Sequence, residues 1–275
     1  MMKLSKKSLV TSVSLAAVLW TGASNVIAAP TTLIYINSSA GALYSYDPSN
    51  SYAQTLIAPA TGALSISSGP AANTIYIQSG AGLLSTYDLV THVQSSGVGS
   101  VPGNALGEGR DGFLYAGSNT DLYRVNSVTG VSTLIGSGAN GYAGDLAVDP
   151  TNLSVLYGAV NTAGGVSLVK VNKTTGAQST PLSFGLPGGT SIFGLGFALD
   201  GTLYATGPTA AGGEIYTVNK TTGFANAVHA VSFQPNDMAT QPFVVSEANL
   251  PEPTSLALVL LGFAGLVLSR RKAQA

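Results

Sequence analysis

A short phrase centred on tyrosine recurs five times along the chain and constrains its fold more than any other feature. In each copy an apolar residue precedes the tyrosine and an apolar or small residue follows it, at Tyr35, Tyr76, Tyr115, Tyr157 and Tyr204. Successive copies are 41, 39, 42 and 47 residues apart. A period of about 40 residues is typical of proteins built from one repeated supersecondary unit.

A second phrase follows each tyrosine and ends on an acidic or amide residue, at Asp47, Asp88, Asn126, Asn172 and Asn219. Both phrases alternate apolar and polar residues, which predicts strands. In the last three units the second phrase runs into a turn that ends on Gly130, Gly176 or Gly223. Asn opens such turns and Gly adopts their left-handed backbone conformation. With a weaker strand on each side, every unit has about four strands, like a β-propeller blade.

We therefore predict an all-β fold, a β-propeller of about five four-stranded blades. The first unit begins directly at its second strand, and the segment from Asp237 to Pro242 is typical of a lone first strand. Pairing of these two ends would close the ring and remove the exposed sheet edges. A six-bladed ring with one degenerate blade, or a β-sandwich, is the alternative.

The N-terminus has the pattern of an export signal. Three lysines precede an apolar stretch, Leu9–Trp20, and the segment ends in small residues at Ala28 and Ala29. This order is that of a secretory signal peptide, read by the Sec machinery and cut by signal peptidase. The predicted organisation is a signal peptide over residues 1–28, a propeller-like repeat domain over 29–246 and a sorting tail over 247–275.

The tail combines three features in order. Pro251, Glu252 and Pro253 precede an apolar run, Ser255–Ser269, and a basic cluster of Arg270, Arg271 and Lys272 follows. Fifteen residues of helix extend only about 22 Å, less than the ~30 Å hydrocarbon core. The basic cluster fits a segment whose end stays on the cytoplasmic side of the membrane.

Residues 251–272 resemble the PEP-CTERM sorting signal of Gram-negative bacteria. The resemblance implies that an exosortase, a membrane cysteine transpeptidase, recognises Pro251, Glu252 and Pro253. It also implies a short transmembrane helix that anchors the chain transiently in the inner membrane, with Arg270, Arg271 and Lys272 as its stop. The final location would be the cell surface or the extracellular matrix of a biofilm. An ordinary C-terminal anchor is the alternative.

Charge and cysteine content exclude several functions. Between Thr31 and Asn249 there are five basic and eleven acidic residues, which disfavours nucleic-acid binding. The chain has no cysteine, so it has no disulfide, no thiolate nucleophile and no cysteine-ligated metal.

Candidate site residues occur where the repeats stop matching. The position just before each predicted first strand is occupied by Ala63, Ala105, Asp145, Gly194 and Asp237. In a propeller, Asp145 and Asp237 would lie near the mouth of the central channel, with Glu108 further in. Such carboxylates could hold Ca²⁺ or act as an acid–base pair; the other interpretation is a solvated rim. No other metal or cofactor is expected.

The repeat domain resembles secreted propellers whose blades carry a Leu-Tyr phrase followed by Val-Asn-x-x-Thr-Gly. These include binding modules, scaffolds and some enzymes, so the resemblance implies no activity. The sequence favours a non-enzymatic role, structural, adhesive or binding polysaccharide or protein. The alternative is a secreted propeller enzyme, of lyase or lactonase type, with an acidic site at the channel mouth.

Overall fold

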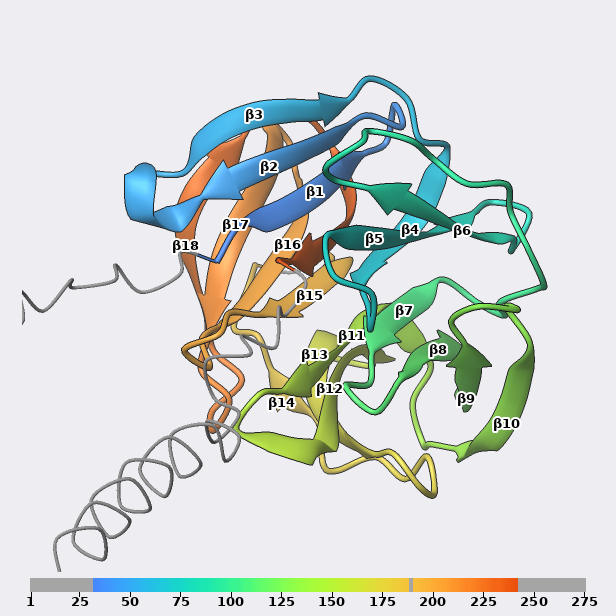
Figure 1. The fold of residues 1–275 in the computed structure, drawn as a ribbon. Coiled ribbons are helices and arrows are strands. Elements are labelled where there is room, and N and C mark those ends of the chain that lie inside the picture. Colours follow the sequence, from blue (N-terminus) through green and yellow to red (C-terminus); the bar gives the residue numbers. More distant parts are fainter. Residues whose placement is uncertain (1–31, 188–189, 242–275) are drawn as a thin grey trace, which may run out of the picture. The chain divides into compact units, whose positions relative to one another are not determined.

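Strands joined by tight turns make up nearly all of residues 32–187 and 190–241, which the computed structural model describes. These residues form five antiparallel sheets. One end strand of each sheet contacts the corresponding end strands of the two neighbouring sheets. These contacts run once around a closed ring (Figure 1). The fold is a five-bladed β-propeller, as predicted. The predicted signal peptide and sorting tail lie outside the described residues.

Each strand has a fixed place between the axis and the rim of its blade. The innermost strands of blades 1 to 5 are β19 (Pro235–Thr240), β4 (Ala63–Ser68), β7 (Ala105–Glu108), β11 (Tyr142–Asp149) and β15 (Gly194–Phe197). The second strands are β1 (Ile34–Ser38), β5 (Thr74–Ser79), β8 (Phe113–Ser118), β12 (Asn152–Thr162) and β16 (Leu203–Thr209). The third strands are β2 (Leu43–Asp47), β6 (Leu84–Asp88), β9 (Asp121–Asn126), β13 (Gly165–Asn172) and β17 (Gly212–Val218). The outer strands are β3 (Ala53–Ala58), β10 (Ser132–Ser137), β14 (Leu182–Ser183) and β18 (Ala225–Val231).

Blade 2 departs from the four-stranded prediction, because its sheet contains only β4, β5 and β6 in the described residues. The segment after β6 still covers the outer edge through isolated bridges, such as Leu84 with Val98 and Tyr87 with Gln94. The only helical element described is the short 3₁₀ turn η1 (Pro48–Asn50). In this part of the chain the structure shows no helix of the length and apolarity that a membrane crossing requires.

The ring closes by pairing strands from its two ends. β19 and β1 are antiparallel, with Tyr35 opposite Ala239 and Ile36 opposite Met238 (Figure 1). The last strand is therefore the innermost strand of the blade that the first strand begins. This arrangement confirms the predicted closure and gives β1 a partner strand on its inner side.

The repeated turns have the predicted chemistry. The side chain of Asn126 accepts hydrogen bonds from the backbone N–H groups of Val128 and Thr129, both at 2.9 Å. Asn172 and Asn219 do the same for the two residues at equivalent positions. Gly130, at the end of the first of these turns, has a φ of 67°, which residues with a Cβ rarely adopt.

The five tyrosines determine how the blades pack. Each is buried and pairs with a small residue of its innermost strand: Ala239, Ser67, Gly107, Ala147 or Gly196. Each ring also belongs to an apolar cluster shared with the next blade; Tyr157, for example, contacts Phe197 of blade 5 at a centroid distance of 5.5 Å. The hydrophobic core therefore consists of five separate clusters, one between each pair of neighbouring blades.

Close packing near the axis predicts a penalty for added volume. A Cβ on Gly107 would lie 2.2 Å from the carbonyl oxygen of Leu146 in the next blade. We expect Gly107→Ala to lower the free energy of unfolding by about 2 kcal/mol, because the innermost strands would have to separate. Chemical denaturation measures this loss. Gly80→Ala is the matched control, since nothing lies within 4 Å of its Cβ; equal effects of the two substitutions would contradict the packing argument.

Candidate functional site

Asp145 and Asp237 occupy the same position in two different blades. In every blade we define the axial position as the residue two before the partner of the repeated tyrosine: Ser65, Ala105, Asp145, Gly194 and Asp237. The sequence analysis placed Ala63 here instead of Ser65, and it placed these residues before the strands. The structure puts them within the innermost strands, and a bulge between Ala63 and Ser65 shifts the register of β4.

The two aspartates accept hydrogen bonds from the free edges of the innermost strands. Asp145 accepts from Leu106 N–H of blade 3 at 3.1 Å and from Leu195 N–H of blade 5 at 3.4 Å. Asp237 accepts from Ile66 N–H of blade 2 at 2.9 Å and from Met238 N–H at 2.8 Å. An innermost strand has no further strand to pair with on its axial side, so these N–H groups need another acceptor.

The two carboxyl groups meet at the centre of the ring and are only 1% exposed. Burial raises the pKa of Asp145 well above its ordinary value, and the nearby charge of Asp237 raises it further. Burial also raises the pKa of Asp237, while hydrogen bonds, including one with Asp145, partly oppose this. Two neighbouring carboxylates cannot both ionise cheaply in such an environment, so the protonated form of the pair is favoured relative to that of solvated aspartates.

Glu108 lies apart from this pair. It ends β7, is 8% exposed and accepts a hydrogen bond from the Ser68 hydroxyl at 3.1 Å. Glu108, Arg110 and Asp145 line a cavity of about 20 Å³, which has room for about one water molecule. Burial raises the pKa of Glu108 and lowers that of Arg110 to about 10, and the attraction between their charges opposes both shifts.

This geometry limits the chemistry available at the axis. Among residues 32–187 and 190–241, no three acidic or histidine side chains converge as metal ligands. The histidines are elsewhere: His92 contacts Tyr87 beside β6, and His229 stacks on Tyr52 from β18. The pKa values of Asp145 and Asp237 are both shifted upward and not in opposite directions, and the oxygens of both side chains already accept backbone hydrogen bonds. The arrangement suits closure of the ring better than contact with a substrate.

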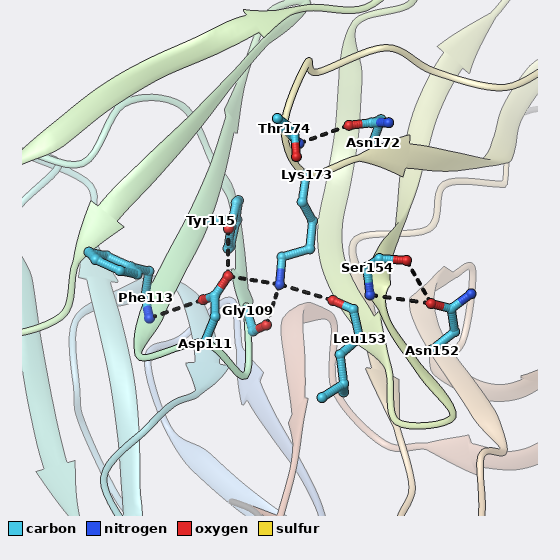
Figure 2. A network of polar contacts seen from close by, with 10 residues as sticks. All are labelled: Gly109, Asp111, Phe113, Tyr115, Asn152, Leu153, Ser154, Asn172, Lys173 and Thr174. Carbon is cyan, nitrogen blue, oxygen red and sulfur yellow. Dashed lines mark hydrogen bonds and ion pairs between the residues drawn. The ribbon is translucent and has the colours of Figure 1, made fainter.

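A second charged network, which the sequence analysis missed, joins blades 3 and 4. Figure 2 shows Lys173, from the turn after β13, directed at the loop between β7 and β8. Its ammonium group lies 2.9 Å from Asp111 Oδ2 and donates to the carbonyls of Gly109 and Leu153 at 2.6 and 3.1 Å. It also lies 5.0 Å from the centroid of the Tyr115 ring. Although burial acts to raise it, the pKa of Asp111 is lowered by hydrogen bonds from Lys173 and Tyr115.

Lys220 forms a similar ion pair between blades 4 and 5. It lies 2.9 Å from Asp149 of blade 4 and 5.2 Å from the centroid of the Phe197 ring. Lys173 and Lys220 both follow the asparagine that opens the repeated turn. That shared position is the signal that sequence reasoning could have used, but the turn alone does not reveal which side chains of the neighbouring blade it faces.

The sequence matches no protein-family model and no curated protein. Among solved structures, hydrazine synthase of Kuenenia stuttgartiensis is similar at 16% identity and a TM-score of 0.44, over 61% of this chain and 49% of that one. TolB of Acinetobacter baumannii is similar at 13% identity and a TM-score of 0.46, over 74% of this chain and 55% of that one. A Bacteroides thetaiotaomicron protein of unknown function is similar at 13% identity and a TM-score of 0.49, over 78% of this chain and 66% of that one.

The chain thus spans between about half and two thirds of the length of these solved chains. Likenesses this distant carry no argument about what the protein does. The functional proposals below rest on the residues of this chain alone.

The axial pair predicts a specific pH dependence. A carboxyl with a raised pKa in the folded state stabilises the protein at low pH, and this stability is lost as pH rises above the ordinary aspartate pKa of about 4. An asparagine at position 145 does not titrate, so Asp145→Asn does not lose stability in this way as pH rises. Asparagine has one side-chain oxygen, so either Leu106 N–H or Leu195 N–H loses its acceptor, which lowers the free energy of unfolding by about 1–3 kcal/mol. We expect the stability gap between the wild type and Asp145→Asn to narrow from pH 4 to pH 9 in urea denaturation.

Asp88→Asn serves as a control of opposite sign. Hydrogen bonds from the backbone N–H groups of Thr91 and Val90 lower the pKa of Asp88. The free energy of unfolding of the wild type should therefore increase relative to that of Asp88→Asn as the pH rises from acidic values. A stability gap between the wild type and Asp145→Asn that stays constant with pH would contradict the raised pKa of Asp145.

The Lys173 network predicts a loss of stability that exposed lysines do not share. Lys173→Met keeps most of the aliphatic chain but removes the cation beside Asp111 and the donor to two carbonyl groups. We expect the free energy of unfolding to fall by about 2 kcal/mol, the value of hydrogen bonds to a charged group. Lys170→Met is the matched control, because Lys170 is exposed and only approaches the Tyr157 ring at 5.9 Å. Equal stabilities of the two variants, measured by thermal and chemical denaturation, would refute the role of the network.

Proposed function

We propose that this chain is an exported, non-catalytic binding propeller that an exosortase-type system delivers to the surface or extracellular matrix of a Gram-negative bacterium. Its body would act as a structural or adhesive module that binds polysaccharide or another matrix protein. The proposal has two parts, delivery and binding, which depend on different residues.

Delivery rests on the sequence of the two ends. The signal-peptide pattern over residues 1–28 supports export, and the order of Pro-Glu-Pro, apolar run and basic cluster over residues 251–272 supports sorting. A cysteine-free, ring-closed body also suits an exported protein, because the fold needs no disulfide and the strands from its two ends pair with each other.

The non-catalytic role is supported chiefly by the state of Asp145 and Asp237. These are the strongest candidates for acid–base chemistry in the described residues, yet both are buried and hydrogen-bonded to the innermost strands. A general acid or base must be within hydrogen-bond reach of its substrate. The adjoining cavity of about 20 Å³ is too small for a sugar ring or a lactone. Binding on the outside of the ring is therefore the function we favour.

The sorting proposal predicts two distinct localisation defects. In a host with an exosortase, deletion of residues 251–275 should release the body untethered, because the apolar run is gone. Replacing Pro251, Glu252 and Pro253 by alanine in the full chain should instead leave an unprocessed protein in the inner membrane, because the anchor remains and the recognition motif is lost. Cell fractionation with immunoblotting separates these outcomes. Wild-type localisation of both variants would sink the sorting proposal.

A further inference from the structure

An open groove lies between blades 3 and 4. Its volume is about 490 Å³, within the range of 300–1,000 Å³ that is usual for small-molecule sites. Lys173 and Asp111 form part of its wall, and Figure 2 shows this region. The ion pair between them balances their charges, so their contribution is mainly to hold the wall in place.

An extension of β12 contributes to the blade 4 side of the groove. β12 begins at Asn152, five residues before its tyrosine, whereas the other second strands begin one or two residues before theirs. The additional residues include Leu153 and Ser154, which line the groove together with Thr174 of the turn after β13. The groove is therefore a particular property of this pair of blades and does not follow from the repeat.

The register of blade 3 places Arg124 on the face that borders the groove. Tyr115 pairs with Arg124, and Arg124 pairs with Thr133, so the three side chains form one row across β8, β9 and β10. Cross-strand partners project from the same face of a sheet. Tyr115 packs against the core of blade 4, so this face is directed at blade 4. Arg124 and Thr133 both line the groove.

Arg124 is the second cation, beside Lys173, that lines the groove. Its guanidinium lies 4.5 Å from the centroid of the Phe113 ring, which holds it in place. Within residues 32–187 and 190–241 the structure gives this guanidinium no hydrogen bond and no ion pair with the protein. In a body with eleven acidic and five basic residues, an arginine without an acidic partner in a groove is a ready site for an anion.

The other lining groups indicate what kind of anion would fit. Thr133, Ser154 and Thr174 provide hydroxyl groups, which both donate and accept hydrogen bonds. The Ser154 hydroxyl donates to Asn152 at 2.7 Å and can still accept a bond from a ligand (Figure 2). Ile135 and Leu153 line the groove and add apolar surface, and Leu153 is 48% exposed. Hydroxyl groups beside apolar patches suit a sugar ring, which has polar edges and apolar C–H faces.

We propose that the groove binds a carboxylate-bearing saccharide, with Arg124 pairing with the carboxylate. The planar guanidinium matches a carboxylate with two parallel hydrogen bonds. Thr133, Ser154 and Thr174 bond the sugar hydroxyls, and Ile135 and Leu153 contact the ring face. This inference rests on the proposed binding function and names both the site and the ligand class for it. An acidic peptide is less favoured, because acidic motifs are recognised by clusters of arginine and a single arginine lines this groove.

Isothermal titration calorimetry with trigalacturonate, on the full-length protein in detergent, tests this site. We expect the wild type to bind and Arg124→Gln to bind at least about tenfold more weakly, as loss of a charge-assisted pair requires. The methyl ester of trigalacturonate lacks the charge and should bind the wild type as weakly as the acid binds Arg124→Gln. Lys170→Gln removes the same charge from an exposed position on blade 4 and should bind like the wild type.

Three results would overturn the proposal: no binding of trigalacturonate by the wild type at millimolar concentration, equal affinity in Arg124→Gln, or equal affinity for the ester. Tighter binding of hexaglutamate through Arg124 would overturn the saccharide class and keep the groove. Saccharide binding that Arg124→Gln leaves intact would refute the groove while the proposed binding function stands. Thermal melting of each variant verifies folding, which we expect to be unchanged because Arg124 is exposed.

Discussion

The fold depends on how closely five innermost strands can approach a common axis. Where the repeated tyrosines press from the second strands, the innermost strands have only glycine, alanine or serine. Small residues let neighbouring backbones come together, as the position of Gly107 against the Leu146 carbonyl shows. The same closeness leaves the axial N–H groups without water or a further strand. Asp145 and Asp237 meet this need, so the side chains that most resemble a catalytic pair are required by the architecture.

Burial of these two acids follows from topology and could not be predicted from spacing. The strands, the turns and the end-to-end closure are local or pairwise features, and alternation and turn residues predicted them. The environment of Asp145 depends instead on backbone groups of blades 3 and 5, which lie 39 and 50 residues away along the chain. The register of β4 depends on a bulge that leaves no clear mark in its sequence. The positions of Asp145 and Asp237 on the ring were therefore predictable from the sequence, but the burial of their side chains was not.

The few basic residues of the body show a division of roles that the sequence alone concealed. Lys173 and Lys220 connect neighbouring blades through aspartates, and Arg110 lies in the charge environment of Glu108 and Asp149. Such contacts between repeats resist the separation of blades, which matters in a protein whose core is divided into five clusters. Once these cations are assigned to the fold, Arg124 and the exposed Lys170 remain, and only Arg124 lines the groove.

A repeat fold gives every blade the same scaffold, so a binding site has to arise from a difference between blades. At the axis the differences are two aspartates, which the strand edges engage. Between blades 3 and 4 the difference is the longer start of β12, which contributes to the blade 4 side of the groove. An axial substrate would have to displace hydrogen bonds that hold the ring together, whereas a ligand in the groove contacts side chains that the fold leaves available. For this propeller, stability and recognition are thus separated in space, with closure at the centre and binding between the blades.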